Sequence, residues 1–139
     1  MLTNAELKYI TKKNGSRFNW ASEYKVPERE IYKLTIANNP NIIQGVISLE
    51  VKADHVFMHL IESAPFNIGK QKTYIGVPAN LVAFACKLSF QHGGEGYVSF
   101  VAKTKFIAHY IESLGASNVG GHLMVITTAT ALKLIDKYF

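Results

Sequence analysis

Alternating or β-branched apolar residues mark three stretches in the first half of the chain. They are residues 30–38 (EIYKLTIAN), 42–51 (IIQGVISLEV) and 55–63 (HVFMHLIES), and the turn-forming segments NNPN and KAD separate them. A hydrophobic period of two is typical of β-strands, and short turns between strands favour antiparallel pairing. The pattern therefore predicts an antiparallel meander of three strands.

The period becomes helical at Pro78. Leu81, Phe84, Ala85 and Leu88 recur at i, i+3, i+4 and i+7, which is the spacing of an amphipathic helix. The glycine-rich segment HGGEG (92–96) ends this predicted helix.

Predicted strands and helices then alternate to the end of the sequence. The strands are residues 97–102 (YVSFVA) and 122–126 (HLMVI), and the helices are residues 103–115 (KTKFIAHYIESLG) and 127–139 (TTATALKLIDKYF). We expect Thr104 to cap the first of these helices and Gly115 to end it. The expected buried residues are Ile107, Tyr110, Ile111 and Leu114 in the first helix, and Leu132, Ile135 and Phe139 in the second.

This order of elements indicates the fold class. A strand–helix–strand step within one sheet needs a parallel crossover, so the predicted sheet is mixed and mostly antiparallel, with flanking helices. We assign an α+β fold to a single domain spanning residues 1–139. In the N-terminal 27 residues we expect a short helix capped by Asn4 and an edge strand over residues 17–26 that ends at Pro27.

Composition narrows the class of protein. A chain of 139 residues with 48% hydrophobic and 18% charged residues is long enough for one core and is not disordered. No apolar run approaches the ~18 residues of a membrane span, and the N-terminus has no signal-peptide core, so we expect a cytoplasmic protein without a membrane partner. Cys86 is the only cysteine and is expected to be buried. The net charge of +5 favours phosphate-bearing ligands or nucleic acid, but a solvated surface explains it equally well.

The segment TYIGVPANL, residues 73–81, carries candidate chemistry. Gly76 allows a sharp turn, and Pro78 fits the first helical turn because it has no N–H to lose. A helix start with small residues exposes several N–H groups at the positive end of the helix dipole, which suits phosphate or pyrophosphate. A simple strand-to-helix turn remains the alternative.

In this context the chain resembles the GNAT superfamily of acyl-CoA-dependent N-acetyltransferases. The family motif is Arg/Gln-x-x-Gly-x-Gly/Ala, and here Thr73 takes its first position, Gly76 its first glycine and Pro78 its last position, followed by Ala79. A family tyrosine precedes a Gly-Phe pair, as Tyr110 precedes Gly115, although Ala116 replaces the phenylalanine and Lys103 replaces an upstream asparagine. The resemblance covers residues 32–126 and implies a three-layer acyltransferase fold with a shortened N-terminal part.

The resemblance implies acetyl-CoA as co-substrate, with no metal. The pyrophosphate would be held by the backbone of Gly76, Val77, Pro78, Ala79, Asn80 and Leu81, with Lys103 nearby. The pantetheine arm would pair like an extra strand along the end of HLIESAP, at Ile61 and Ser63. A backbone N–H near Ile61 would then serve as the oxyanion donor.

Two side chains are candidates for proton transfer. Glu62 is the only carboxylate at the end of its predicted strand, and a preceding β-bulge would turn it from the core face towards a cleft as the base. An exposed strand-end glutamate is the alternative. By the same resemblance, Tyr110 would protonate the departing thiolate, because a phenol of pKa ~10 can donate to a thiolate of pKa ~8.5 and recover its proton. Its alternative is a half-buried packing tyrosine.

Three functions follow from these residues. The first is transfer of an acetyl group from acetyl-CoA to a primary amine, on a small molecule or a peptide, by a monomer or homodimer. The second is a non-catalytic GNAT-like protein that binds acyl-CoA or a protein partner. The third is a toxin-type acetyltransferase of aminoacyl-tRNA, which the basic charge supports weakly.

Overall fold

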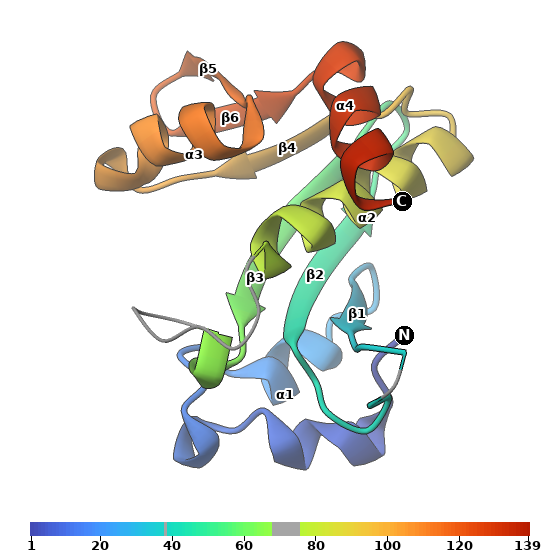
Figure 1. The fold of residues 1–139 in the computed structure, drawn as a ribbon, viewed down its shortest axis with the longest axis vertical. Coiled ribbons are helices and arrows are strands. Elements are labelled where there is room, and N and C mark those ends of the chain that lie inside the picture. Colours follow the sequence, from blue (N-terminus) through green and yellow to red (C-terminus); the bar gives the residue numbers. More distant parts are fainter. Residues whose placement is uncertain (38, 68–75) are drawn as a thin grey trace.

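A six-stranded sheet organises the computed structural model, which describes residues 1–37, 39–67 and 76–139 (Figure 1). The strand order is β1-β2-β3-β4-β6-β5. The strands are β1 (Glu30–Leu34), β2 (Gly45–Val51), β3 (Val56–Ser63), β4 (Val98–Val101), β5 (Ser117–Gly120) and β6 (Leu123–Ile126). Only β3 and β4 pair in parallel among these described strands. The predicted mixed, mostly antiparallel sheet is confirmed.

The predicted meander is also confirmed, with shorter strands. β1 pairs antiparallel with β2, and β2 pairs antiparallel with β3. β1 stops at Leu34 and β2 starts at Gly45. Residues 35–37 and 42–44, which the prediction placed in these two strands, therefore lie outside them.

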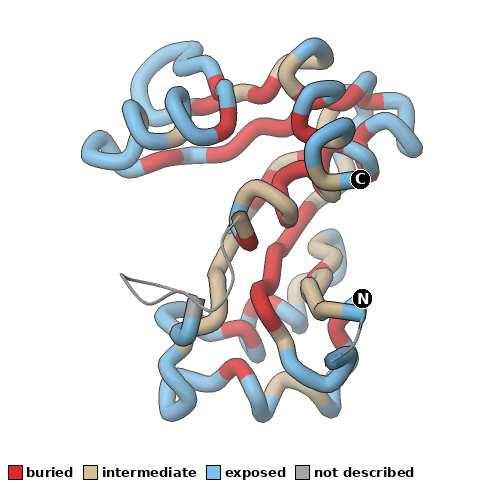
Figure 2. Tube along the Cα trace, in the orientation of Figure 1, coloured by how far each residue is buried: buried red, intermediate tan, exposed pale blue. Residues whose placement is uncertain are grey.

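The main core lies between the sheet and the helices α2 (Val77–Gln91), α3 (Ile107–Leu114) and α4 (Thr128–Tyr138). The predicted helix from Pro78 is confirmed as α2, and its residues Leu81, Ala85 and Leu88 are buried, as expected. Figure 2 shows continuous burial along much of β2 and β4. In the part of the chain that the structure describes, no helix is long and apolar enough to span a membrane.

The C-terminal half shows three differences from the sequence prediction. β5 is an additional strand, fully exposed, that forms by pairing with β6. Thr104 does not cap α3, because a short 3-10 helix, η4 (Thr104–Phe106), precedes it. The Ile111 side chain is exposed rather than buried. Gly115 does end α3, with a φ of 72° and an N–H that donates to the Ile111 carbonyl at 3.0 Å.

The buried stripe of α4 is also displaced from the predicted one. Ala131 and Leu134 are buried and Ile135 and Tyr138 pack at the edge of the core, while Leu132 and Phe139 are exposed. The four core residues again follow helical spacing, and α4 packs mainly against α2. The prediction for Leu132 and Phe139 was therefore wrong, because α4 packs against another helix and its buried stripe is rotated.

The N-terminal segment covers the opposite face of the sheet. It contains two 3-10 helices, η1 (Asn4–Tyr9) and η2 (Lys12–Asn14), and the α-helix α1 (Trp20–Tyr24). A second buried cluster forms there from Leu2, Ile10, Trp20, Ile31 and Val46. Val46 and Ile47 are consecutive in β2 and belong to different clusters, so the two cores lie on opposite faces of the sheet.

Two N-terminal predictions were wrong. The cap of η1 is Thr3 and not Asn4, and the Thr3 N–H donates to the Glu6 side chain at 2.9 Å. Residues 17–26 contain α1 and form no edge strand. The helix starts there because Asn19 Oδ1 accepts the Ser22 N–H at 3.1 Å and caps it.

Cys86 lies fully buried in α2, as expected, and burial raises the pKa of its thiol to about 12. Only the thiolate reacts rapidly with alkylating reagents. We therefore expect iodoacetamide at about pH 8 to leave the native protein unmodified and to label Cys86 fully in denaturant, as measured by intact mass. Labelling of the native protein at the denatured rate would contradict this burial.

Candidate active site

Strands β3 and β4 diverge after a short parallel contact. Their register places Val56 opposite Val98 and Phe57 opposite Ser99, and Figure 1 shows the strands separating beyond this point. Beyond Phe57, β3 keeps β2 on one side and, within the described residues, has no β4 partner on the other. An unpaired strand edge presents alternate N–H and C=O groups to any extended chain that lies along it. Ile61 and Ser63 both lie on this open section.

Helix α2 begins near the end of this section. Its N-cap is Gly76, with a φ of 77°, and Pro78 is in the first turn. The first N–H groups of a helix have no intrahelical acceptor and lie at the positive end of its dipole. Val77 and Leu81 anchor this turn as buried side chains, while Pro78 is exposed and Ala79 and Asn80 are partly exposed. The backbone of residues 76–80 is thus held in place by its neighbours.

Gly45 permits this close approach of α2 to the sheet. It pairs with Ser63 at the end of β3. A Cβ atom at Gly45 would lie 2.7 Å from Cγ1 of Val77 and 2.9 Å from Cδ1 of Leu81, closer than side chains tolerate. A glycine is therefore needed where the end of the sheet meets the start of α2.

A β-bulge lies in β3 before Glu62. Leu60 pairs with Ser48 and Met58 pairs with Leu49, so His59 is an extra residue in β3. Val56 and Met58 face the main core, whereas Leu60 packs against the N-terminal cluster. An extra residue reverses the side-chain alternation beyond it. The expected bulge is confirmed, and it places Glu62 on the face opposite α2.

The Glu62 carboxylate is fixed by two donors from the N-terminal segment. Oε1 accepts the indole N–H of Trp20 at 2.9 Å, and Oε2 accepts the backbone N–H of Arg17 at 2.6 Å. Glu62 lines a pocket of about 430 Å³. Its other lining residues are Tyr9, Ile10, Asn14, Ser16, Asn41, Ile42, Ile43, Gly45, Val46, Ser63, Ala64, Pro65 and Phe66. Glu62 is therefore not a freely moving glutamate at a strand end.

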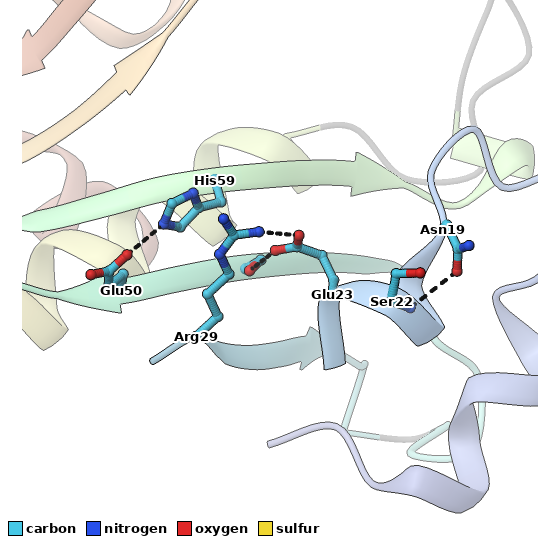
Figure 3. Close-up of polar contacts among 7 residues, drawn as sticks. Asn19, Ser22, Glu23, Arg29, Glu50 and His59 are labelled. Carbon is cyan, nitrogen blue, oxygen red and sulfur yellow. Dashed lines mark hydrogen bonds and ion pairs between the residues drawn. The ribbon is translucent and has the colours of Figure 1, made fainter. Parts of the chain in front are cut away.

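A polar network holds α1, and with it Trp20, against the sheet (Figure 3). Glu23 of α1 is buried, forms an ion pair with Arg29 and accepts the hydroxyl of the buried Ser48 at 2.6 Å. Nearby, His59 of the bulge contacts Glu50 at 2.8 Å, and the hydrogen bonds from Lys52 and His59 lower the pKa of Glu50. Buried polar groups that satisfy each other fix the geometry of what they join.

Tyr110 lies on α3, beside β4 on the other arm of the divergence. Its ring packs edge-on against Phe100 of β4, with ring centroids 5.2 Å apart, and burial raises the pKa of its phenol above the ordinary value. Lys103 is exposed just after β4 and occupies the N-cap position of η4. Neither residue lines the Glu62 pocket.

The predicted site residues that the structure describes thus fall into two groups, one on each side of the divergence between β3 and β4. Ile61, Glu62 and Ser63 lie at the end of β3, where Gly45 of β2 packs against the start of α2, and the Glu62 side chain lies on the opposite face of the sheet. Tyr110 and Lys103 belong to the opposite arm. Thr73 lies outside the described residues.

Three residues of this site were missed in the sequence analysis. They are Trp20, Arg17 and Gly45. Only the position of Gly45 within a β-branched strand could have indicated a close backbone approach.

The fold as a whole is similar to that of several solved structures. A structure of mutant forms of the spermidine/spermine N-acetyltransferase SpeG from Vibrio cholerae aligns with a TM-score of 0.66 at 15% identity, over 95% of this chain and 94% of SpeG. Tetrahymena GCN5 aligns with a TM-score of 0.57 at 10% identity, over 86% of this chain and 81% of GCN5. The chain has the GNAT fold.

A third solved structure, from a KacTA–DNA complex, aligns with a TM-score of 0.61 at 13% identity, over 96% of this chain and 86% of that one. No protein-family model and no curated protein matches the sequence. Across the described residues, no group of three or more His, Cys, Asp or Glu side chains could hold a metal ion.

Proposed function

We propose that this protein is an acetyl-CoA-dependent N-acetyltransferase of a primary amine. The observation that carries the proposal is the open edge of β3 beside the start of α2, with a fixed carboxylate at the end of the same strand. The GNAT fold supports this assignment, because SpeG, with the same fold, is an N-acetyltransferase.

The residues at this edge suit acetyl-CoA in two respects. The open section of β3 offers backbone donors and acceptors to the amide groups of a pantetheine arm. The N-terminus of α2 offers N–H groups and a positive dipole to the pyrophosphate. Bound acetyl-CoA would supply the thioester, and the chain would supply orientation and proton transfer.

In the proposed reaction the amine nitrogen forms a bond to the acetyl carbon and the carbon–sulfur bond breaks. Glu62 takes the proton that the ammonium must lose before it can attack, and the second proton on the nitrogen passes to solvent as the amide forms. A backbone N–H near Ile61 stabilises the oxyanion. Tyr110 gives its proton to the leaving thiolate, and its raised pKa keeps the phenol protonated throughout the neutral and mildly alkaline range. Without turnover, the same edge would serve a non-catalytic acyl-CoA-binding protein.

Binding of acetyl-CoA tests the first step. At about 100 times its Kd, acetyl-CoA should stabilise the fold by about 2.7 kcal/mol, seen as a rise in melting temperature. Gly76→Asp should abolish this rise, because a carboxylate would repel the pyrophosphate at the N-cap of α2. No rise in the unaltered protein at millimolar acetyl-CoA would reject the assignment.

Gly93→Asp is the matched control for this substitution. Gly93 follows the other end of α2 and has a φ of 84°, close to the 77° of Gly76, with no atom within 4 Å of an added Cβ. Both substitutions therefore carry the same kind of backbone strain. We expect Gly93→Asp to lower the melting temperature while keeping the acetyl-CoA response. An equal loss of response in both variants would make the Gly76 effect structural.

A further inference from the structure

Among the described residues that line it, the pocket that contains Glu62 has one charged side chain and mostly apolar walls. Among its lining residues in the described chain, Glu62 is the only ionisable acid or base apart from the tyrosine Tyr9. The apolar part of the walls comes from Ile10, Ile42, Ile43, Val46, Pro65 and Phe66. Its volume of about 430 Å³ is that of a small-molecule site.

Three large apolar side chains of this pocket are exposed. Tyr9 is 58%, Ile42 is 47% and Phe66 is 42% exposed, and they come from three separate segments. Covering such surface with an apolar ligand removes it from water, which favours binding. The walls therefore suit a ligand with an apolar body.

The carboxylate suits one cationic group and no more. Each carboxylate oxygen has two acceptor positions, and Trp20 and Arg17 each occupy one of them. The remaining positions can accept an ammonium. A second ammonium in the same ligand would find no second carboxylate among the described lining residues. It would face apolar groups and the uncharged side chains of Asn14, Ser16, Asn41 and Ser63, and a charge without a counter-ion is costly to bury.

We propose that this pocket binds a primary amine that carries a single positive charge on an apolar, ring-sized body, and that it discriminates against polyamines. This inference rests on the proposed function in treating the amine as the acetyl acceptor. The position of the pocket agrees with this role. Gly45 lines the pocket and also lies directly against Val77 and Leu81 at the start of α2, where the acetyl-CoA site is proposed. The acceptor and the acetyl donor would thus approach the end of β3 from neighbouring sites.

Trp20 provides a binding signal that does not depend on turnover. It is the only tryptophan in the chain, and its indole N–H donates to the carboxylate that would receive the ammonium. We would titrate the protein, without acetyl-CoA, with 2-phenylethylamine, spermidine and 2-phenylethanol, and follow tryptophan emission. We expect saturable binding of 2-phenylethylamine at least about tenfold tighter than that of the other two ligands, since each lacks one of the two required features.

Two variants complete the test. Glu62→Gln should weaken the binding of 2-phenylethylamine about tenfold or more. Glu28→Gln, which removes an exposed carboxylate outside the pocket, should leave its affinity unchanged. The comparison with 2-phenylethanol tests the need for charge in the unaltered protein, even if Glu62→Gln fails to fold.

The outcomes separate this inference from the proposed function. Spermidine binding as tight as 2-phenylethylamine, or an absence of saturable amine binding, would overturn the inference. Saturable binding of 2-phenylethylamine with no acetylation would support the pocket and count against the acetyltransferase. Acetylation of spermidine in preference to 2-phenylethylamine would support the acetyltransferase and overturn the pocket assignment.

Discussion

Glu62→Gln should lower turnover with acetyl-CoA about 100-fold or more at neutral pH, with partial recovery at higher pH. An aliphatic amine with a pKa near ~10 is almost fully protonated at neutral pH, so loss of the base should matter most there. As the pH approaches the pKa of the amine, unprotonated acceptor becomes available and the variant should approach the unaltered protein. Initial rates of thiol release between about pH 6.5 and 9.5 would measure this.

The structure adds a stability effect to this prediction. A glutamine keeps one oxygen for Trp20 or Arg17, and its amide group would face the other N–H donor. Leaving one of these donors unsatisfied should cost about 1–3 kcal/mol, which most folded proteins survive. Melting curves must therefore accompany the kinetics, with Glu28→Gln at an exposed carboxylate as the control. A loss of turnover that is equal at every pH would mean that Glu62 only holds the N-terminal segment in place.

Tyr110→Phe should uncouple acetyl-CoA binding from turnover. The substitution keeps the ring that packs against Phe100 and removes one oxygen, so the free energy of unfolding should change by less than ~1.5 kcal/mol. Affinity for acetyl-CoA should stay near normal, because the proposed contacts are with backbone on β3 and α2. If the phenol is the acid, kcat should fall about 100-fold.

The raised pKa of Tyr110 gives this prediction a pH dependence. Because burial favours the neutral phenol in the folded state, its pKa lies above the ordinary value of ~10. The phenol should therefore remain a proton donor up to at least about pH 10. Its contribution to stability is present below the unfolded pKa and is lost as the pH rises through the folded one.

An exposed tyrosine provides the control for this substitution. Tyr97 directly precedes β4 and is 38% exposed, so Tyr97→Phe removes a phenol oxygen outside the proposed site. We expect this variant to keep a normal kcat. Near-normal kcat in Tyr110→Phe as well would make Tyr110 a packing residue.

Elements with long, regular periods were predictable from the sequence. The meander and α2 follow from local alternation and helical spacing, because each buries one continuous face. The helix end at Gly115 was predictable from the need for a left-handed residue there.

The N-terminal segment was not predictable because its structure depends on distant partners. Trp20 is held by Glu62, which lies 42 positions later in the sequence, and Glu23 is held by Ser48, 25 positions later. Read alone, residues 17–26 resemble a strand as much as a helix. β5 was missed for a related reason, because SNVG has no buried face and becomes a strand only by pairing with β6.

The candidate site was predictable in part. The position of Glu62 at a strand end and the glycine before α2 could be read from the sequence. The two donors that fix the carboxylate, and the pocket around it, required the folded N-terminal segment.

The bulge at His59, and not residue identity alone, determines on which face of the sheet the Glu62 carboxylate lies. If β3 kept its present length and ran without the bulge, the alternation established by Val56 and Met58 would continue, and the same glutamate would point into the apolar core beneath α2. A relative of this protein can therefore carry a glutamate at the aligned position and still lack the site. Comparisons within the fold should establish whether the strand carries this bulge before they assign the carboxylate a role.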